Sequence, residues 1–479
     1  MITTQNNNKQ VIVTGALLLV LSIAPFLMQG AYHDSQRLLS VFITSSLIAC
    51  HIFTSNAWSK TSLSTIAIIA VWGALGSAES PNTLWSHVEV ALFVSIAIST
   101  IIIFKDISDS ALLKLAIFMA LAQLTYITRD YLIYFFYLMD SRAPDPVEII
   151  DGFSNRRFYG QFLSWTLPFL IAILAIKKEL PFRKTLLSIA ILSCTLVYVS
   201  GTRAFLLGMI FSVLCVAWVN PNTWKSYFRQ VIIISIGGLA GYLLLTFLIP
   251  HLAGVDTSLL TRYTIERDFT NSSGRVAIWG KTLDIALANP VTGIGPMMLA
   301  DESIIASVGV AHPHNLLLQI MAEWGIPFAM MFSGLILYIT LKWRGLIRQS
   351  PDSREKLSLP ITASVSSAAA VSLVDGIAVM PVSLTYMAVI LGCGAALWRE
   401  WTPEVRRFKL PIWVAGIFLL FVSLPPAFSA RHWLTAPPTE SMEMTTRQQT
   451  PRFWADGRIP SAATANEEQI ALQKDIAAR

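Results

Sequence analysis

Long apolar runs, separated by short polar connections, dominate this sequence. About 20 apolar residues carry a helix across a bilayer core, so each run predicts a membrane-spanning helix. The runs are 11–29, 37–55, 61–78, 88–104, 112–138, 158–176, 185–200, 203–219, 230–249, 315–341, 358–376, 380–398 and 410–428. They predict an all-α fold, a polytopic integral membrane bundle of about 12–13 helices.

The positions of Lys and Arg between these runs predict the orientation of the bundle. If the N-terminus is cytoplasmic, the inside connections hold most of the basic residues, among them Lys60, Lys105 and Lys177. The opposite connections near 30–36 and 78–87 hold almost none. Because cytoplasmic loops collect Lys and Arg, we expect an inside N-terminus.

This orientation divides the chain into four segments. We expect an N-terminal bundle of about nine spans over 1–249 and further spans over 315–428. Between them, residues 250–314 would form a long periplasmic catalytic loop, and the polar tail over 429–479 would lie on the same outer side. A connection this long in a chain with otherwise short loops usually has a function.

Composition agrees with a membrane protein. Of the 479 residues, 54% are hydrophobic and 13% are charged, whereas soluble domains are about a quarter charged. The net charge of +6 resides in short loops, so it does not indicate a nucleic-acid surface. The four cysteines lie in apolar runs without a CxxC pair, and we interpret them as small core residues rather than as a disulfide or a metal site.

The middle of the long loop predicts a helix. Ser272 or Ser273 can cap its start, and Asn289-Pro290 ends it. Its apolar residues recur at helical spacing: Val276, Trp279, Leu283 and Leu287. This stripe could lie on the membrane surface or over the bundle. The segment Gly293-Ile294-Gly295 then predicts a flexible turn.

His314 lies where the long loop leads into the run at 315–341. The free N–H groups of a helix N-terminus carry partial positive charge, which disfavours imidazolium and attracts anions. A neutral imidazole can accept a proton from a hydroxyl, so His314 is a candidate general base. The alternative is that His314 only caps the helix or hydrogen-bonds at the interface.

Several arginines are expected on the outer side, against the topological bias, and such groups are typical of phosphate binding. They are Arg156, Arg157, Arg203, Arg262, Arg267 and Arg275. The alternative is snorkelling, or salt bridges with acidic residues of the same loop. Arg129, Asp130 and Asp375 fall within or at the end of apolar runs, where charges are costly and usually mark a site or a buried pair.

Three motifs in order carry a family resemblance. The first is Ser200-Gly201-Thr202-Arg203-Ala204. The second is Ser273-Gly274-Arg275, followed by Trp279, Ala286, Asn289-Pro290 and Gly293-Ile294-Gly295. The third is His312-Pro313-His314-Asn315, followed by Gln319, Glu323 and Gly325-Ile326-Pro327. Together they resemble the O-antigen ligase family, which is grouped with Wzy-type O-antigen polymerases and bacterial O-oligosaccharyltransferases.

The resemblance implies a GT-C-like membrane glycosyltransferase in the bacterial inner membrane, with its active site facing the periplasm. Its donor would be a glycan on undecaprenyl pyrophosphate, and no nucleotide sugar or other cofactor would be needed. In the ligase branch the acceptor is lipid A–core, in lipopolysaccharide biosynthesis, and the family there works without a required metal. In the polymerase branch the acceptor is another lipid-linked repeat unit, and in the third branch it is a protein.

At the matching positions, the resemblance implies catalytic roles for His314, Arg275 and Arg203. The weaker candidates for contacts with the pyrophosphate or glycan are His312, Asn315, Arg156 and Arg157. Ligase and polymerase remain alternatives, because no residue that we identify separates them. A lipid-linked glycan flippase is a third interpretation, but a transporter would place polar residues at the midplane and show internal repeats.

Overall fold

The computed structural model describes residues 2–26, 32–54, 57–150, 152–153, 155–256, 274–301, 304, 308, 310–402, 407–409, 411, 413–414, 416–417 and 420. The helices are α1 (Ile2–Ile23), α2 (Tyr32–Thr54), α3 (Lys60–Ala78), α4 (Thr83–Ile102), α5 (Asp109–Met139), α6 (Pro146–Ile149), α7 (Arg157–Ile176), α8 (Arg183–Ser200), α9 (Arg203–Val219), α10 (Trp224–Leu243), α11 (Ile249–Leu252), α13 (Arg275–Ala288), α15 (Leu316–Trp324), α16 (Ile326–Arg348), α17 (Pro351–Ser372) and α18 (Pro381–Trp401). Shorter elements are the 3-10 turns η1 (Ala24–Phe26) and η3 (Met298–Ala300), the π-helical turn η2 (Leu244–Leu248), and the strands β1 (Ala57–Ser59) and β2 (Arg407–Lys409).

The structure confirms an all-α polytopic membrane protein. Within the described ranges, eight helices are long and apolar enough to cross a bilayer, and α9 is a shorter apolar helix beside them. Exposed apolar residues cover the outside of this bundle, for example Leu214 at 62%, Ile236 at 63% and Leu337 at 60%. A surface of this kind would promote aggregation in water, but it matches the acyl chains of a membrane.

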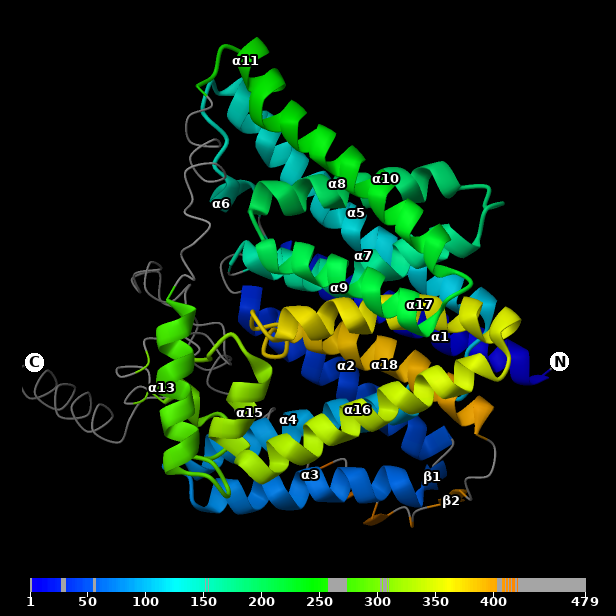
Figure 1. The fold of residues 1–479 in the computed structure, drawn as a ribbon, viewed down its shortest axis with the longest axis vertical. Coiled ribbons are helices and arrows are strands. Elements are labelled where there is room, and N and C mark those ends of the chain that lie inside the picture. The colour runs from blue at the N-terminus through cyan, green and yellow to red at the C-terminus, as the bar shows by residue number, and fades with distance from the viewer. Residues whose placement is uncertain are drawn as a thin grey trace, which may run out of the picture.

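Helix α7 lies at the centre of the bundle (Figure 1). It contacts α5, α8, α9, α10, α17 and α18, and all of its residues from Phe158 to Ala175 are buried. A helix that is apolar all round belongs in such a position. Helix α17 packs against both α7 and α9, so the spans after the long loop share one core with the spans before it.

The predicted run 315–341 is not one helix. It breaks at Gly325 into α15 and α16, and α16 continues to Arg348. Gly325 has φ +86 and ψ 162, and a Cβ on this residue would lie 2.0 Å from the carbonyl oxygen of Val291. Only glycine fits this backbone and this close approach. The prediction of a continuous span was therefore wrong here.

Polar contacts stabilise the end of the bundle opposite α13. The buried Glu355 carboxylate accepts hydrogen bonds from the backbone N–H groups of Asn222, at 2.9 Å, and Thr223, at 3.1 Å, where α10 begins. Strands β1 and β2 pair antiparallel, with Trp58 opposite Phe408. These contacts join connections that are far apart in the sequence.

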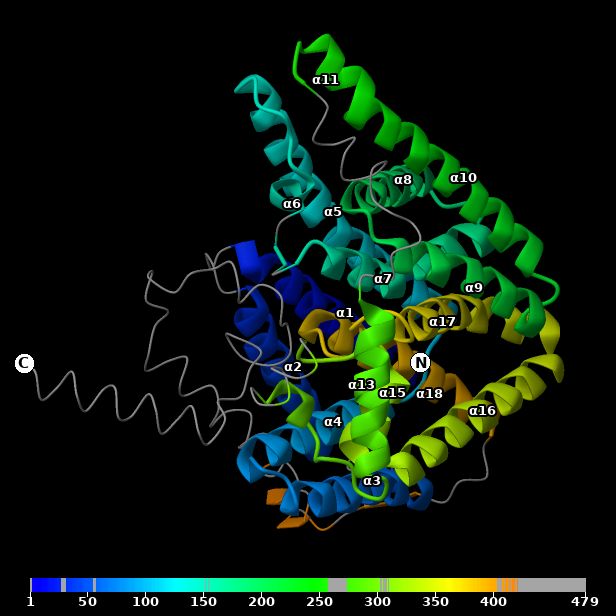
Figure 2. The same ribbon diagram turned by 60° about the vertical axis from the view of Figure 1, so that its left-hand side comes forward.

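Helix α13 runs crosswise to α3 at the other end of the bundle, as both views show (Figure 1; Figure 2). Of the expected thirteenth run, 410–428, only isolated residues are described. The tail over 429–479, the expected caps Ser272 and Ser273, and Arg262 and Arg267 lie outside the described residues.

Candidate active site

His314 precedes α15 in a backbone conformation that few residues other than glycine adopt, with φ +54. Such a conformation persists only where the surrounding structure holds it. The cap of α15 is Asn315, whose side-chain oxygen accepts a hydrogen bond from the N–H of Leu318 at 3.1 Å. Because Asn315 fills the capping position, the imidazole of His314 is not the helix cap.

The segment around His314 is held from two sides. The indole Nε1 of Trp279, on α13, donates a hydrogen bond to the carbonyl oxygen of Pro313 at 2.8 Å. The N–H of His314 donates to Nδ1 of His312 at 3.3 Å, and the two ring centroids are 4.2 Å apart. His312 is buried against Gly376, where a Cβ would lie 2.5 Å from the ring. His312 therefore positions its neighbour within the protein.

Asp375, in the connection between α17 and α18, faces the His314 imidazole. Its Oδ1 lies 3.5 Å from His314 Nδ1 and accepts hydrogen bonds from Gln161 Nε2, at 3.0 Å, and from the N–H of Gly376, at 2.8 Å. The Asp375 side chain is 3% exposed and that of His314 is 21% exposed. A carboxylate beside Nδ1 favours the tautomer in which Nε2 can accept a proton.

The charge of Asp375 is maintained despite its burial. Burial alone would raise the pKa of this carboxyl group. The nearby His314 imidazole, the N–H of Gly376 and the charge of Arg275 together outweigh burial, so the pKa lies below its ordinary value. Asp375 is therefore an ionised group that can orient an imidazole and stabilise it when it is protonated.

Three arginines lie close enough to interact electrostatically at this end of the bundle. Burial lowers the pKa of Arg275, the charge of Asp375 raises it, and the charges of Arg157 and Arg203 lower it further. Arginine stays protonated all the same. Among the described residues, the buried Nε of Arg275 has no hydrogen-bond partner. Arg275 therefore interacts with one carboxylate and two further guanidinium groups, so positive charge is in excess and the arrangement favours an anionic ligand.

The backbone explains how Arg203 reaches this position. Gly201 ends α8 in the left-handed conformation, with φ +65, and Arg203 then begins α9. A Cβ on Gly160 of α7 would lie only 2.4 Å from the methyl carbon of Thr202, so α7 and this turn pack very closely. Arg157 begins α7 itself. Both arginines therefore lie at helix N-termini, where the helix dipole also attracts anions.

A comparison with known protein families matches residues 188–333, and the matching family is described as O-antigen ligase. This match supports the resemblance to the O-antigen ligase family over residues 188–333, which we call the ligase segment. No curated protein matches the chain. The ligase segment includes Arg203, Arg275 and His314, the three residues to which the sequence motifs point. Arg157, Gln161 and Asp375 lie outside it, and only the fold brings them to the same place.

The ligase segment also contains residues whose polar groups serve the fold. Glu323 is fully buried, and its carboxylate accepts from the N–H of Leu299 at 3.0 Å and from Gln319 Nε2 at 3.3 Å. The turn at Gly293 is closely packed, because a Cβ there would lie 2.4 Å from the Glu323 backbone. The expectation of a flexible turn was wrong, since these motif residues fix the connection from α13 to α15.

The other residues that the sequence pointed to have the following positions and contacts. Asn315 uses its amide nitrogen as well, donating to the carbonyl oxygen of Leu373 at 3.1 Å, so it ties α15 to α17. Arg156 immediately precedes α7 and is half-buried. Arg129 packs over the Phe26 ring, 4.5 Å from its centroid, and Asp130 is buried inside the bundle.

Sequence reasoning missed two supports of the site. Gln161 lies one turn into α7, and nothing in an apolar run predicts that a glutamine would reach Asp375. Arg37 on α2 is 3% exposed and donates to the carbonyl oxygen of Val379 at 2.8 Å, which anchors the connection that carries Asp375. A lone arginine at the start of a span was the available signal.

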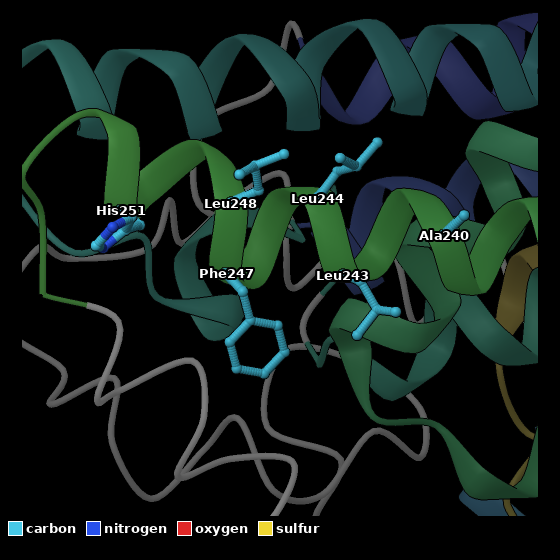
Figure 3. A pocket seen from close by; sticks show the side chains of 6 residues that line it. All are labelled: Ala240, Leu243, Leu244, Phe247, Leu248 and His251. Carbon is cyan, nitrogen blue, oxygen red and sulfur yellow. The ribbon is translucent and has the colours of Figure 1, made fainter.

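An apolar groove lies along α10, η2 and α11, and none of the residues just described lines it (Figure 3). It measures about 600 Å³ and is lined by Ala240, Leu243, Leu244, Phe247, Leu248 and His251. A groove on a membrane helix with this lining suits hydrocarbon. In the described part of the chain, no group of three or more His, Cys, Asp or Glu residues is arranged to hold a metal ion.

Proposed function

We propose that this protein transfers a glycan from undecaprenyl pyrophosphate to an acceptor hydroxyl, as an O-antigen ligase acting on lipid A–core. The observation that carries this proposal is the meeting of the His314–Asp375 pair with Arg275, whose electrostatic neighbours are Arg203 and Arg157. A proton acceptor beside a site for an anion is what this transfer needs. The ligase family of residues 188–333 supports the same assignment.

The transfer exchanges one bond to the sugar for another. The bond between the anomeric carbon and the phosphate oxygen breaks, and the acceptor oxygen forms a new bond to that carbon. The hydroxyl proton passes to Nε2 of His314, and the diphosphate leaves with the electron pair of the broken bond. Because the diphosphate is a good leaving group, no general acid is required.

The arginines would stabilise the leaving group. Negative charge develops on the bridging phosphate oxygen as the bond breaks, and preorganised cations in a partly buried site stabilise it more than water does. Arg275 is the central group, because its half-buried guanidinium has a buried Nε without a partner among the described residues. Arg203 and Arg157 would bind the remaining phosphate oxygens bidentately.

Asp375 would act as a positioning residue in this scheme. It orients His314 through Nδ1, which leaves Nε2 facing the substrate, and it stabilises the imidazolium that forms. Gln161 and Gly376 hold the carboxylate in turn. The 3.5 Å separation is at the outer limit of a hydrogen bond, and such contacts commonly tighten when substrate binds.

We place this end of the bundle on the periplasmic side of the bacterial inner membrane. The distribution of Lys and Arg in the connecting loops supports that orientation. The stretch 250–314 would then be the periplasmic catalytic loop, between the spans of 1–249 and those of 315–428. A lipid-linked donor and a lipid-anchored acceptor would both reach the site from the outer leaflet.

Complementation of a ligase-deficient strain tests the proposal. We expect Arg275→Ala and His314→Ala each to abolish glycan transfer while the protein still accumulates in the membrane. Lys281→Ala, an exposed change on the same helix as Arg275, is the matched control and should retain transfer. Normal transfer by both site variants would refute the mechanism.

Analysis of lipopolysaccharide on gels separates the two branches of the family. Loss of all capped chains on deletion of the gene indicates a ligase. Chains that each carry a single repeat unit indicate a polymerase, which would use the same site with a lipid-linked glycan as acceptor.

A further inference from the structure

Helix α13 has three distinct faces. One is apolar and exposed: Val276 is 67%, Leu283 38% and Leu287 59% exposed. A second packs on the protein, with Thr282 and Ala286 fully buried. A third is polar and exposed, with Lys281 and Asp284.

The angles between these faces give their order around the helix axis. Residues advance about 100° each around a helix, so Val276, Leu283 and Leu287 fall within about 40° of one another. By the same count the buried face lies about 100° to one side of this stripe, and the polar face about 110° to the other. The helix therefore has protein on one side, an apolar surface next to it, and a polar surface beyond. This is the pattern of a helix that lies flat at a membrane surface beside its own protein.

The C-terminal end of α13 lies next to the end of a membrane-spanning helix, α3. Directly after α13, Thr292 donates a hydrogen bond to the carboxylate of Glu79 at 2.7 Å, at the end of α3. Val291 is 62% exposed and Leu75, on the last turn of α3, is 55% exposed. Glu79 is exposed and ends a membrane-spanning helix, so it marks the level of the lipid headgroups. The C-terminal end of α13 lies at that level.

We propose that α13 is a membrane-contacting helix, seated in the bilayer interface at this end of the bundle. Val276, Leu283 and Leu287 face the acyl chains, and Lys281 and Asp284 face headgroups and water. The crosswise course of α13 relative to α3 fits a helix in the plane of the membrane (Figure 1; Figure 2). The occupant of the stripe is lipid, and this assignment does not depend on the reaction proposed above.

Contact between α13 and the bilayer would help to position the residues of the candidate active site. Arg275 begins α13, and Trp279 holds the segment of His314 through Pro313. The depth at which α13 lies in the interface therefore sets where both groups stand relative to a lipid-linked substrate.

Site-specific fluorescence in lipid tests this proposal. The four free cysteines, Cys50, Cys194, Cys215 and Cys393, are first replaced in a variant that still inserts into the membrane. Single cysteines are then introduced by Leu283→Cys, Leu287→Cys, Lys281→Cys and Asp284→Cys, labelled with a nitrobenzoxadiazole dye, and reconstituted in phosphatidylcholine nanodiscs. We expect blue-shifted emission and quenching by spin-labelled lipid at 283 and 287, and quenching by aqueous iodide at 281 and 284.

Two outcomes would overturn the proposal. Iodide quenching at all four positions would mean that the stripe faces water. Protection of 283 and 287 from both quenchers would mean that protein covers the stripe, such as the segment 257–273. Neither readout involves glycan transfer, so failure here leaves the proposed function intact, and loss of the proposed function leaves this result interpretable.

Discussion

His314 Nδ1 lies 3.5 Å from Asp375 Oδ1, although α15, α16 and α17 separate the two residues in the chain. The imidazole belongs to the ligase segment and the carboxylate lies beyond it. A base of this kind depends on its partner for tautomer and orientation. The contact therefore makes the connection between α17 and α18 part of the proposed catalytic machinery.

Removal of the Asp375 charge should reduce transfer while the protein remains folded. Asp375→Asn keeps the shape of the side chain and one acceptor oxygen but loses the negative charge that favours the Nδ1–H tautomer and stabilises the imidazolium, so we expect a rate loss of about 100-fold or more. Transfer to a defined acceptor in proteoliposomes measures it. Asp284→Asn, an exposed carboxylate on α13, is the control and should be near wild type. Equal rates for Asp375→Asn and wild type would remove Asp375 from the mechanism.

The lowered pKa of Asp375 predicts how stability depends on pH. The folded state favours the ionised carboxylate, so the Asp375 charge contributes to the stability of the fold above the unfolded pKa of about 4. It is lost as the pH falls through the lower folded pKa. We therefore expect the melting temperature of the wild type to exceed that of Asp375→Asn at about pH 5 to 8. The difference between the two melting temperatures should shrink below about pH 4. Melting curves in detergent across this range provide the check, and a constant difference would contradict it.

The hydrogen bond from Trp279 to Pro313 should matter for rate more than for accumulation. Trp279→Phe keeps a large aromatic ring but removes the 2.8 Å bond that joins α13 to the His314 segment. A single hydrogen bond contributes about 1 kcal/mol, so we expect roughly a fivefold loss of transfer. Steady-state rates of purified protein measure this loss. An unchanged rate would show that other contacts hold the segment.

Two glycines of the ligase segment should respond in opposite ways to alanine. Gly325→Ala forces a Cβ against the Val291 carbonyl in a backbone region open only to glycine. We therefore expect the free energy of unfolding to fall by more than about 3 kcal/mol. Gly280 lies in α13, and a methyl group added to it would have nothing within 4 Å. Gly280→Ala should therefore raise the free energy of unfolding by up to about 1 kcal/mol through the higher helix propensity of alanine. Apparent melting temperatures compare the two, and similar values would refute the packing argument.

Periodicity predicted most of the helices because each span must cross the same apolar layer; of roughly 12–13 expected spans, eight described helices are long and apolar enough to cross it. The runs at 158–176 and 203–219 correspond closely to α7 and α9. The break at Gly325 escaped this reasoning, because the sequence on both sides is apolar and only contact with Val291 requires the turn. Serine and alanine in α17 weakened its apolar signal, since that helix packs against α7 and α9 rather than against lipid.

The lengths of the apolar runs alone establish a helical membrane protein, because bilayer thickness dictates the length of every span. The three motifs that resemble the O-antigen ligase family also pointed to Arg203, Arg275 and His314. Only the tertiary structure brought Asp375 and Gln161 to that histidine and Arg157 to those arginines. Helix packing places residues side by side regardless of their separation in the chain, so no local pattern records these contacts.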